Sequence, residues 1–331
     1  MQAITEPPSP GSLAQFDAQF GRRFILTVDT EEEFDWSKPL DRVGHTLDHV
    51  TRLAKFQDFC EALDIVPIYL VDWPIVNSKL AAEILRPAIA AGKAEIGVQL
   101  HPWVNPPFDE DVTPANSFAG NLPRALEAAK LGNLRDKIEA TFGVAPLIYR
   151  AGRYGTGPNT ADILGVNGIA VDTSVRANFD YSAGSGPDYS GHPLAPYWID
   201  SDHTLLELPL TTIFWGMLRK QGRSLFPLCQ RVPHLPGVLS RLGMLERISL
   251  TPEGVSIEEA IRAIDIAVDD GLPLLVFSFH SPSLKPGYTP YVRNDRDLDT
   301  LYDWFREAFA YCARRGVLPT TVGGIMRAVK R

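Results

Sequence analysis

Short apolar runs alternate with amphipathic stretches along most of this chain, and the alternation limits the folds that it can adopt. The apolar runs are rich in Ile, Val, Leu, Phe and Tyr, which favour strands. They cover residues 24–29, 66–72, 94–100, 146–150, 169–174, 205–210 and 272–280. Segments between them, such as 45–63 and 256–271, carry apolar residues at helical spacing. Strands that alternate with helices build a parallel sheet, so we expect an α/β fold, a (β/α) barrel of about seven or eight strands.

Composition and charge restrict the class of protein. The 331 residues are 45 % hydrophobic and 22 % charged, as in a globular domain, and their net charge is −8. This charge argues against a general nucleic-acid binder or a binder of anionic membranes, because both require a basic surface. Cys60, Cys229 and Cys312 form no CxxC pair, so neither a disulfide framework nor a thiolate zinc site is indicated. Free thiols favour a reducing compartment, and we expect a cytoplasmic protein.

The ends and two long segments suggest how the chain is organised. Residues 1–20 lack the features of a secretory signal, and no apolar run approaches the about 20 residues of a membrane span. We expect residues 1–20 to be a flexible arm and 21–331 to be one barrel domain. Within the domain, 174–203 forms a long aromatic loop, and 214–250 is a basic insertion with six basic residues and one acidic residue.

Charged and polar side chains stand where the predicted strands end. Residues two apart on a strand share a face, so Asp29 and Glu31 point the same way. In (β/α) barrels the carboxyl ends of all strands meet at one face, and the loops there carry the chemistry. The later strands bring Gln99, His101, Arg150, Asp172 and His280 to that face. The sequence therefore predicts one pocket that contains carboxylates, imidazoles and an arginine.

A divalent metal is one ligand that this pocket could hold. The imidazole of His101 and the amide oxygen of Gln99 are both metal donors. One histidine after a strand is more often structural, and the nearby Glu31 is what favours a metal site. His45 and His49 lie four apart, but Asp48 is not placed as the Glu of an HExxH motif, so we interpret them as a surface helix terminus.

Four aromatic residues near the predicted strand ends are candidates for substrate binding. They are Trp103, Tyr154, Tyr181 and Trp198. Their rings could stack on the faces of a sugar, although aromatic residues more often pack loops. Both interpretations stay open at the level of the sequence.

Five short segments, taken in order, are similar to the motifs of a known family. They are TVDTEEEF (27–34), EIGVQLHPW (95–103), YRAGRYG (149–155), VDTSV (171–175) and FSFHSPS (277–283). Together they resemble the polysaccharide deacetylase family, the NodB-homology fold of carbohydrate esterase family four, and most of all its WalW-like bacterial branch. The resemblance spans residues 24 to about 325. It implies a distorted (β/α) barrel and a hydrolase with a divalent metal, of which zinc is the expected one.

The resemblance also implies a role for individual residues. Asp29 matches the general base, and Arg150 matches the arginine that orients it. Asp172 matches the acid that tunes the catalytic imidazole, and His280 matches the general acid. Glu31 takes the position of an acidic metal ligand.

The chain departs from the family pattern in the second motif. The family has a histidine at the position of Gln99 and another where this chain has Trp103, so His101 is the one imidazole in the motif. A glutamine oxygen is a weaker zinc ligand than an imidazole. Gln99 is therefore expected to be a weak metal ligand, and the metal could be a harder ion than zinc.

Three functions follow from these observations. The first is the removal of an N-acyl group, most simply acetyl, from an intracellular amino sugar or saccharide precursor. The second is hydrolysis of another C–N bond, such as that of a cyclic imide or ureide. The third is saccharide binding by a degenerate site without metal. The basic insertion would suit a pyrophosphate-bearing substrate, but a homodimer contact or a solvated face is the simpler explanation.

Overall fold

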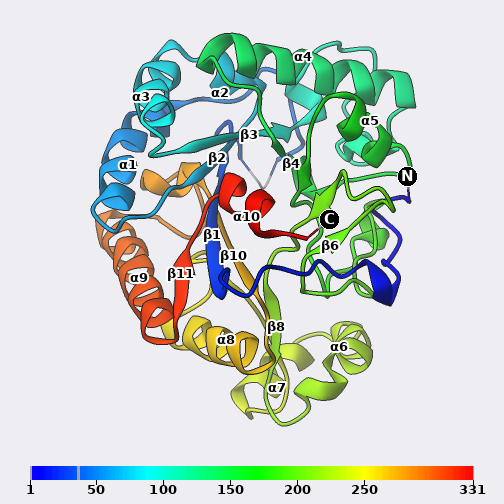
Figure 1. Cartoon of the computed structure of the whole chain (residues 1–331), viewed down its shortest axis with the longest axis vertical. Helices are drawn as coiled ribbons and strands as arrows, with labels where there is room; N and C mark the ends of the chain where they lie inside the picture. Colours follow the sequence, from blue (N-terminus) through cyan, green and yellow to red (C-terminus); the bar gives the residue numbers. More distant parts are fainter. Residues whose placement is uncertain (1, 36–37, 331) are drawn as a thin grey trace.

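A curled, mostly parallel sheet forms the centre of the protein (Figure 1). The computed structural model describes residues 2–35 and 38–330. Within them, one sheet runs in the order β10, β1, β2, β3, β4, β5, β7, β6, and β11 pairs with the start of β1. The bounds are β1 Arg22–Thr30, β2 Ile68–Val71, β3 Glu95–Leu100, β4 Ile148–Ala151, β5 Val171–Asp172, β6 Tyr197–Trp198, β7 Leu206–Glu207, β10 Leu274–His280 and β11 Val317–Pro319. The predicted distorted barrel is confirmed.

The barrel is closed by irregular segments instead of by a continuous ladder. The sheet ends in β10 on one side and in β6 on the other, and an opening remains between β10 and the segment that follows β7. Thr211 spans it, since its N–H donates to the Val276 carbonyl at 3.4 Å and its hydroxyl accepts from the Val276 N–H at 2.9 Å. The Ser278 N–H donates to the Leu250 carbonyl at 3.1 Å. These bonds satisfy backbone groups that an open edge would leave unpaired.

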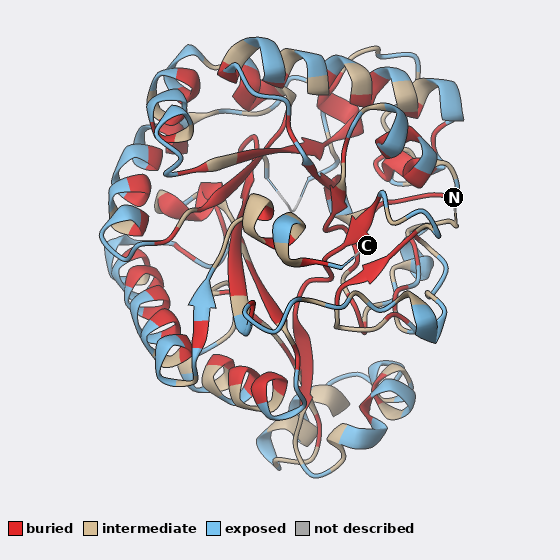
Figure 2. Ribbon diagram, in the orientation of Figure 1, coloured by how far each residue is buried: buried red, intermediate tan, exposed pale blue. Residues whose placement is uncertain are grey.

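Helices surround the sheet and bury one face each, as Figure 2 shows. They are α1 Leu53–Glu61, α2 Trp73–Asn77, α3 Lys79–Ala90, α4 Arg124–Phe142, α5 Thr160–Val166, α8 Ile257–Asp269 and α9 Asp295–Arg314, whereas α10 Val322–Ala328 lies over the centre of the sheet in Figure 1. Helix α8 illustrates the sequence signals: Ser256 and Glu259 form a capping box, and Ala260, Ala263 and Ile264 follow at helical spacing and are buried.

Strand alternation divides the core into two parts. Phe24 and Val28 on β1 pack outward in the large cluster that includes Phe56 and Phe305 of the helices. Ile25 points to the other side, into a second cluster with Val276 of β10 and Ile325 of α10. Thr27 and Asp29 follow Ile25 at a spacing of two, so they share the inner face. α10 packs on the inner cluster, while Asp29 lies at the opposite, carboxyl end of β1.

The N-terminal residues lie against the domain, which differs from the flexible arm that we expected. Ile4 and Phe20 are buried, and Phe16 forms an isolated β-bridge with Val329. The Ile4 carbonyl lies 3.0 Å from Nε2 of His192, which belongs to the aromatic loop. Apolar side chains at positions 4 and 20 supply the contacts that hold this segment.

The two long segments have structure of their own. The aromatic loop 174–203 contains β6 and buries Tyr189 and Tyr197. The basic insertion is a hairpin of β8 Thr212–Trp215 and β9 Glu246–Ser249 that carries α6 Gly222–Gln230 and α7 Leu235–Arg241 away from the barrel (Figure 1). It has a small core of Phe214, Phe226 and Leu245. Over the described residues, no helix combines the length and apolar character that a membrane span requires.

Two glycines allow a close backbone contact beside the loop that follows β4. A Cβ on Gly157 would lie 2.2 Å from the Gly120 carbonyl oxygen, whereas a Cβ on Gly184 in the aromatic loop would meet nothing within 4 Å. We predict that Gly157→Ala lowers the free energy of unfolding by about 1 to 3 kcal/mol, because the backbone must move apart. Gly184→Ala is the matched control and should change it little. Chemical denaturation of both variants tests this, and equal stabilities would contradict it.

Candidate active site

Four strands of the sheet bring most of the predicted site residues together at its carboxyl end. Asp29 on β1 is in register with His280, the last residue of β10. Gln99 on β3 is in register with Arg150 on β4. Because these strands are parallel and the sheet is curled, the ends of β10, β1, β3 and β4 face one another. The contacts among Asp29, Arg150, Glu31, Gln99, His101 and His280 place these six side chains together at this end of the sheet.

Arg150 fixes the carboxylate of Asp29. Its Nη1 donates to Asp29 Oδ1, its Nη2 donates to Thr27 Oγ1 at 2.9 Å, and its Nε donates to the Thr173 carbonyl at 3.0 Å. Both charged side chains are buried. The guanidinium thus compensates the buried carboxylate and leaves Asp29 Oδ2 to face His280 Nε2 at 3.7 Å.

Glu253, and not Asp172, is the carboxylate beside the imidazole of His280. His280 Nδ1 lies 2.7 Å from Glu253 Oε2, and Glu253 Oε1 accepts from the His280 N–H at 3.2 Å. Burial disfavours the imidazolium, but the charges of Glu253, Glu31 and Asp29 outweigh burial and raise the pKa of His280 to about 10. Glu253 follows β9 at the base of the insertion. The sequence reasoning missed it because it stands outside the matched motifs.

Asp172 makes its contacts elsewhere, which corrects the role expected for it. Its Oδ1 accepts from the Ser174 hydroxyl at 2.6 Å, and its strand partner is Glu207 on β7. Both carboxyl groups are fully buried, and burial raises the pKa of each. A protonated member of such a pair can donate to the other, so this pair stabilises the contact between β5 and β7.

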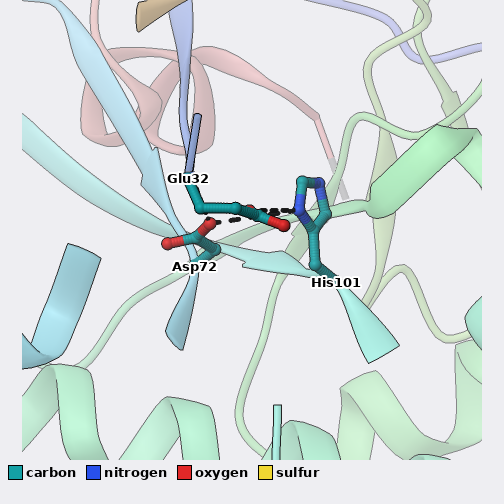
Figure 3. A group of neighbouring side chains, drawn as sticks. All are labelled: Glu32, Asp72 and His101. Atoms are coloured by element: carbon teal, nitrogen blue, oxygen red, sulfur yellow. Dashed lines mark hydrogen bonds and ion pairs between the residues drawn. The ribbon is translucent and has the colours of Figure 1, made fainter. Parts of the chain in front are cut away.

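Glu32 holds the imidazole of His101 in place, as Figure 3 shows. His101 Nδ1 lies 2.8 Å from Glu32 Oε2, and the indole of Trp103 donates to Glu32 Oε1 at 2.8 Å. Asp72 in turn accepts from the Glu32 N–H at 2.7 Å and from the Ile75 N–H at 2.9 Å. Glu32, Asp72 and His101 lie close enough to hold an ion among themselves. Their oxygens are already engaged by N–H donors, so we interpret them as the support that turns His101 Nε2 toward Glu31.

Three predicted ligands do offer a metal site. Glu31 Oε2 lies 3.4 Å from His101 Nε2. The terminal amide nitrogen of Gln99 lies 2.9 Å from Glu31 Oε2 and 3.3 Å from His101 Nε2. The amide oxygen of Gln99 is buried without a hydrogen-bond partner, and a half-turn of the amide would exchange the two atoms. Donors about 2.0 to 2.1 Å from one divalent ion stand roughly 3.0 to 3.4 Å apart. The residues therefore fit such an ion, with Gln99 as an oxygen ligand.

The charge of the site also favours a cation. Burial raises the pKa of Glu31 to about 8, and Asp29 and Glu32 add to this rise while His280 and His101 oppose it. A carboxyl group in such surroundings becomes ionised when a cation binds beside it. Ligation by Glu31, His101 and Gln99 stays a prediction that the geometry supports.

A chain of buried hydrogen bonds joins His49 to this site. The interpretation of His49 as part of a surface helix terminus is therefore wrong. His49 Nδ1 lies 2.7 Å from Glu33 Oε1, and its Nε2 lies 2.7 Å from Ser281 Oγ. The order of groups is that of a serine-hydrolase triad, but Ser281 has 0 % exposure and cannot meet a substrate. Its hydroxyl instead accepts from the Glu31 N–H at 3.3 Å. This chain of hydrogen bonds therefore positions the backbone of Glu31.

The four aromatic candidates separate into two pairs. Trp103 is buried and stacks on His101 with ring centroids 4.4 Å apart, and Trp198 is buried in the inner core. Neither indole can offer its face to a sugar, so substrate stacking is wrong for these two. Tyr154 and Tyr181 are partly exposed and stack on each other at 5.8 Å. Stacking on substrate stays a prediction for this pair.

Comparisons with known proteins identify the fold. No family model and no curated protein sequence matches the chain. Among solved structures, one assigned as a polysaccharide deacetylase from Mycobacterium smegmatis is 19 % identical, with a TM-score of 0.50, and the match covers 96 % of this chain and 98 % of that one. The PuuE allantoinase is 14 % identical, with a TM-score of 0.53 and coverages of 97 % and 93 %. A 4-alpha-glucanotransferase from Thermococcus litoralis is also 14 % identical, with a TM-score of 0.52 and coverages of 93 % and 40 %.

The pairing of His280 with Glu253 predicts a change in titration. In metal-free protein, Glu253→Gln removes a negative charge beside the imidazole, so the pKa of His280 should fall by about 1 to 3 pH units. Glu258→Gln, an exposed carboxylate five residues along the chain, is the control and should leave it unchanged. NMR titration of the imidazole measures both. A His280 titration that ignores Glu253→Gln would show that the contact is not electrostatically important.

If Gln99 is the weak metal ligand, its replacement by histidine should raise the affinity for zinc. Gln99→His should tighten zinc binding by roughly tenfold or more, because imidazole is the better zinc ligand. Gln221→His adds a histidine at an exposed position of the insertion and should have no effect. Competition with a chromophoric chelator measures the affinity. Equal zinc affinity of Gln99→His and the unchanged protein would exclude Gln99 from the site.

The arrangement of the sheet and helices accounts for these matches over nearly the whole chain, even though few residues are identical. The chain therefore has the fold of polysaccharide deacetylases.

Proposed function

We propose that the protein is a metal-dependent hydrolase of the polysaccharide deacetylase family that removes an N-acyl group, most simply acetyl, from a saccharide. One observation carries the proposal: Asp29 Oδ2 and His280 Nε2 lie 3.7 Å apart beside the donor atoms of Glu31, His101 and Gln99. A base, an acid and a metal site in one pocket are the parts that amide hydrolysis requires.

The protein's own groups divide the chemistry between them. A divalent ion held by Glu31, His101 and Gln99 would supply Lewis acidity and a more acidic water. Asp29, fixed by Arg150, would accept the proton of the attacking water. His280 carries a proton at neutral pH because Glu253 and its neighbours raise its pKa, so it can donate to the leaving nitrogen. A carboxylate and an imidazolium with separated roles thus stand side by side.

The proposal also covers the substrate, the cellular location and the metal. The substrate that we propose is an amino sugar or a saccharide precursor inside the cell. The three free cysteines support a cytoplasmic location, since thiols persist in a reducing compartment. Tyr154 and Tyr181 form a partly exposed aromatic surface that would suit a sugar ring. Zinc is the metal that we test first, and Gln99 is the reason to test harder ions as well.

Hydrolysis of another C–N bond, such as that of a cyclic imide or ureide, is the second candidate. The structural likeness to the PuuE allantoinase favours it, because that enzyme shares the fold at a TM-score of 0.53. Acetate release separates the two candidates, since only the first produces it. Saccharide binding without metal is the third, and elemental analysis of the purified protein addresses it.

Substitutions of the acid, the base and a metal ligand should have different effects. His280→Ala and Asp29→Asn should each lower turnover by roughly 10² to 10⁴-fold, the usual loss for a general acid or base, with metal content retained. Glu31→Gln should lower metal occupancy instead. His234→Ala removes an exposed histidine of the insertion and serves as the control.

The measurements are metal stoichiometry and acetate release over a set of N-acetylated saccharides. Activity should fall at high pH as His280 loses its proton, with a limb near its raised pKa of about 10. Full turnover of His280→Ala on a substrate that the unchanged protein deacetylates would refute the proposed mechanism.

A further inference from the structure

Two arginines enclose one aromatic ring beside the candidate active site. Arg176 belongs to the aromatic loop, and Arg247 lies on β9 of the insertion. Their guanidinium carbons lie 3.9 and 3.5 Å from the ring centroid of Phe179. Two guanidinium groups cannot share one face of a ring at these distances, so Phe179 stands between them. Segments that are far apart in the sequence thus bring two positive charges together.

Arg176 contacts a residue that neighbours the candidate active site. The Arg176 guanidinium carbon is 5.3 Å from the ring centroid of Tyr154, four residues after Arg150. Burial raises the pKa of Tyr154, Arg176 opposes this rise and Asp29 adds to it, so the phenol senses both charges. The pKa of Tyr291 responds to the same arginine: burial and Glu253 raise this pKa, and Arg176 opposes the rise. Arg176 is therefore within electrostatic reach of residues next to both Asp29 and the partner of His280.

Neutral groups are the partners that the structure records for this pair. Arg176 donates to the Tyr181 hydroxyl at 3.2 Å and to the Ser249 hydroxyl at 3.4 Å, and Arg247 donates to the Asn178 carbonyl at 2.8 Å. Among the described residues, no carboxylate lies within 4.0 Å of either guanidinium, whereas Arg219 of the same insertion pairs with Asp270 at 3.0 Å. Two adjacent positive charges without a counter-ion repel each other.

One donor of the pair is left without any partner. The Nε of Arg176 is buried and has no hydrogen-bond partner within the described part of the chain. An unsatisfied buried donor on a charged group costs free energy. Burial and the neighbouring Arg176 also lower the pKa of Arg247. An anion placed against the pair would remove both costs, because guanidinium groups bind phosphate and carboxylate through several N–H donors at once.

Packing alone accounts for only part of this arrangement. The stack continues to Phe226, whose ring centroid is 4.6 Å from the Arg247 guanidinium carbon, so it does tie the insertion to the barrel. An uncharged side chain would fill the same space without repulsion or an unsatisfied donor. The two charges therefore need an explanation beyond structural support.

We propose that Arg176 and Arg247 form a subsite for an oxyanion, a phosphate or a carboxylate, that the substrate carries next to its scissile bond. The inference rests on the proposed function and refines it: the substrate is an acidic saccharide, either a sugar phosphate or a sugar acid. The subsite joins the barrel to the insertion, which gives part of the basic segment a role in substrate recognition.

Direct binding to the full chain tests this subsite without reference to catalysis. The probes are N-acetylglucosamine, N-acetylglucosamine 1-phosphate and N-acetylmuramic acid, which carry no anion, a phosphate and a carboxylate. By calorimetry, at least one acidic probe should bind about tenfold or more tightly than the neutral sugar. Tighter binding of the 1-phosphate would identify phosphate as the oxyanion, and tighter binding of the muramic acid would identify carboxylate. Equal affinities for all three would overturn the proposal.

Three variants test whether Arg176 and Arg247 cause the preference for the acidic probe. Arg176→Gln and Arg247→Gln should each reduce it by about tenfold, and Lys220→Gln, an exposed lysine of the insertion, should retain it after the same loss of charge. A preference that survives in both arginine variants would contradict the assignment.

A measurement on the unchanged protein covers the case in which the arginine variants lose stability. The preference for the acidic probe should weaken as chloride concentration rises, because salt screens the charges. A preference that is independent of salt counts against the subsite. Failure of acetate release with intact anion binding would instead refute the proposed reaction and leave the subsite in place.

Discussion

The buried guanidinium of Arg150 holds the end of the sheet together at the point where the reactive groups meet. It extends from β4 to Asp29 and Thr27 on β1 and to the carbonyl of Thr173 after β5. Loss of the guanidinium would leave Asp29 as an uncompensated buried charge, which costs about 3 to 5 kcal/mol. One interaction therefore stabilises a curled sheet and sets which oxygen of Asp29 faces His280.

Three histidines around this pair are held in the same way. His280, His101 and His49 each direct Nδ1 at a carboxylate, which belongs to Glu253, Glu32 and Glu33. Each Nε2 is thereby directed inward, toward Asp29, Glu31 and Ser281 respectively. A carboxylate that holds one ring nitrogen fixes both the orientation and the tautomer of the other. The run of acids at the end of β1 thus has two roles: Asp29 and Glu31 face the site, whereas Glu32 and Glu33 hold histidines.

The pocket carries more buried carboxylates than cations to balance them, and this imbalance explains why a divalent ion suits it. At the neighbouring Arg176 and Arg247 the excess charge is positive, because their recorded hydrogen-bond partners are neutral groups. A substrate with an amide and an anionic group would meet both regions at once. Tyr154 links the two groups of residues, because it follows Arg150 in the sequence and its ring contacts Arg176. The proposed reaction and the proposed subsite therefore depend on different residues.

Local patterns in the sequence predicted the strands, the helices and the residues at the strand ends. Parallel strands must bring their carboxyl ends to one edge, so Asp29, Glu31, Gln99, His101, Arg150 and His280 could be placed together from their positions alone. The partners of these residues could not. Glu253 reaches His280 from a turn after β9, and Asp172 faces Glu207 although its motif suggested the imidazole. Trp103 and Trp198 carried no local sign of burial, and His49 resembled a helix end. Periodicity reports which face of an element a side chain takes, whereas the tertiary structure alone decides which distant group stands opposite that face.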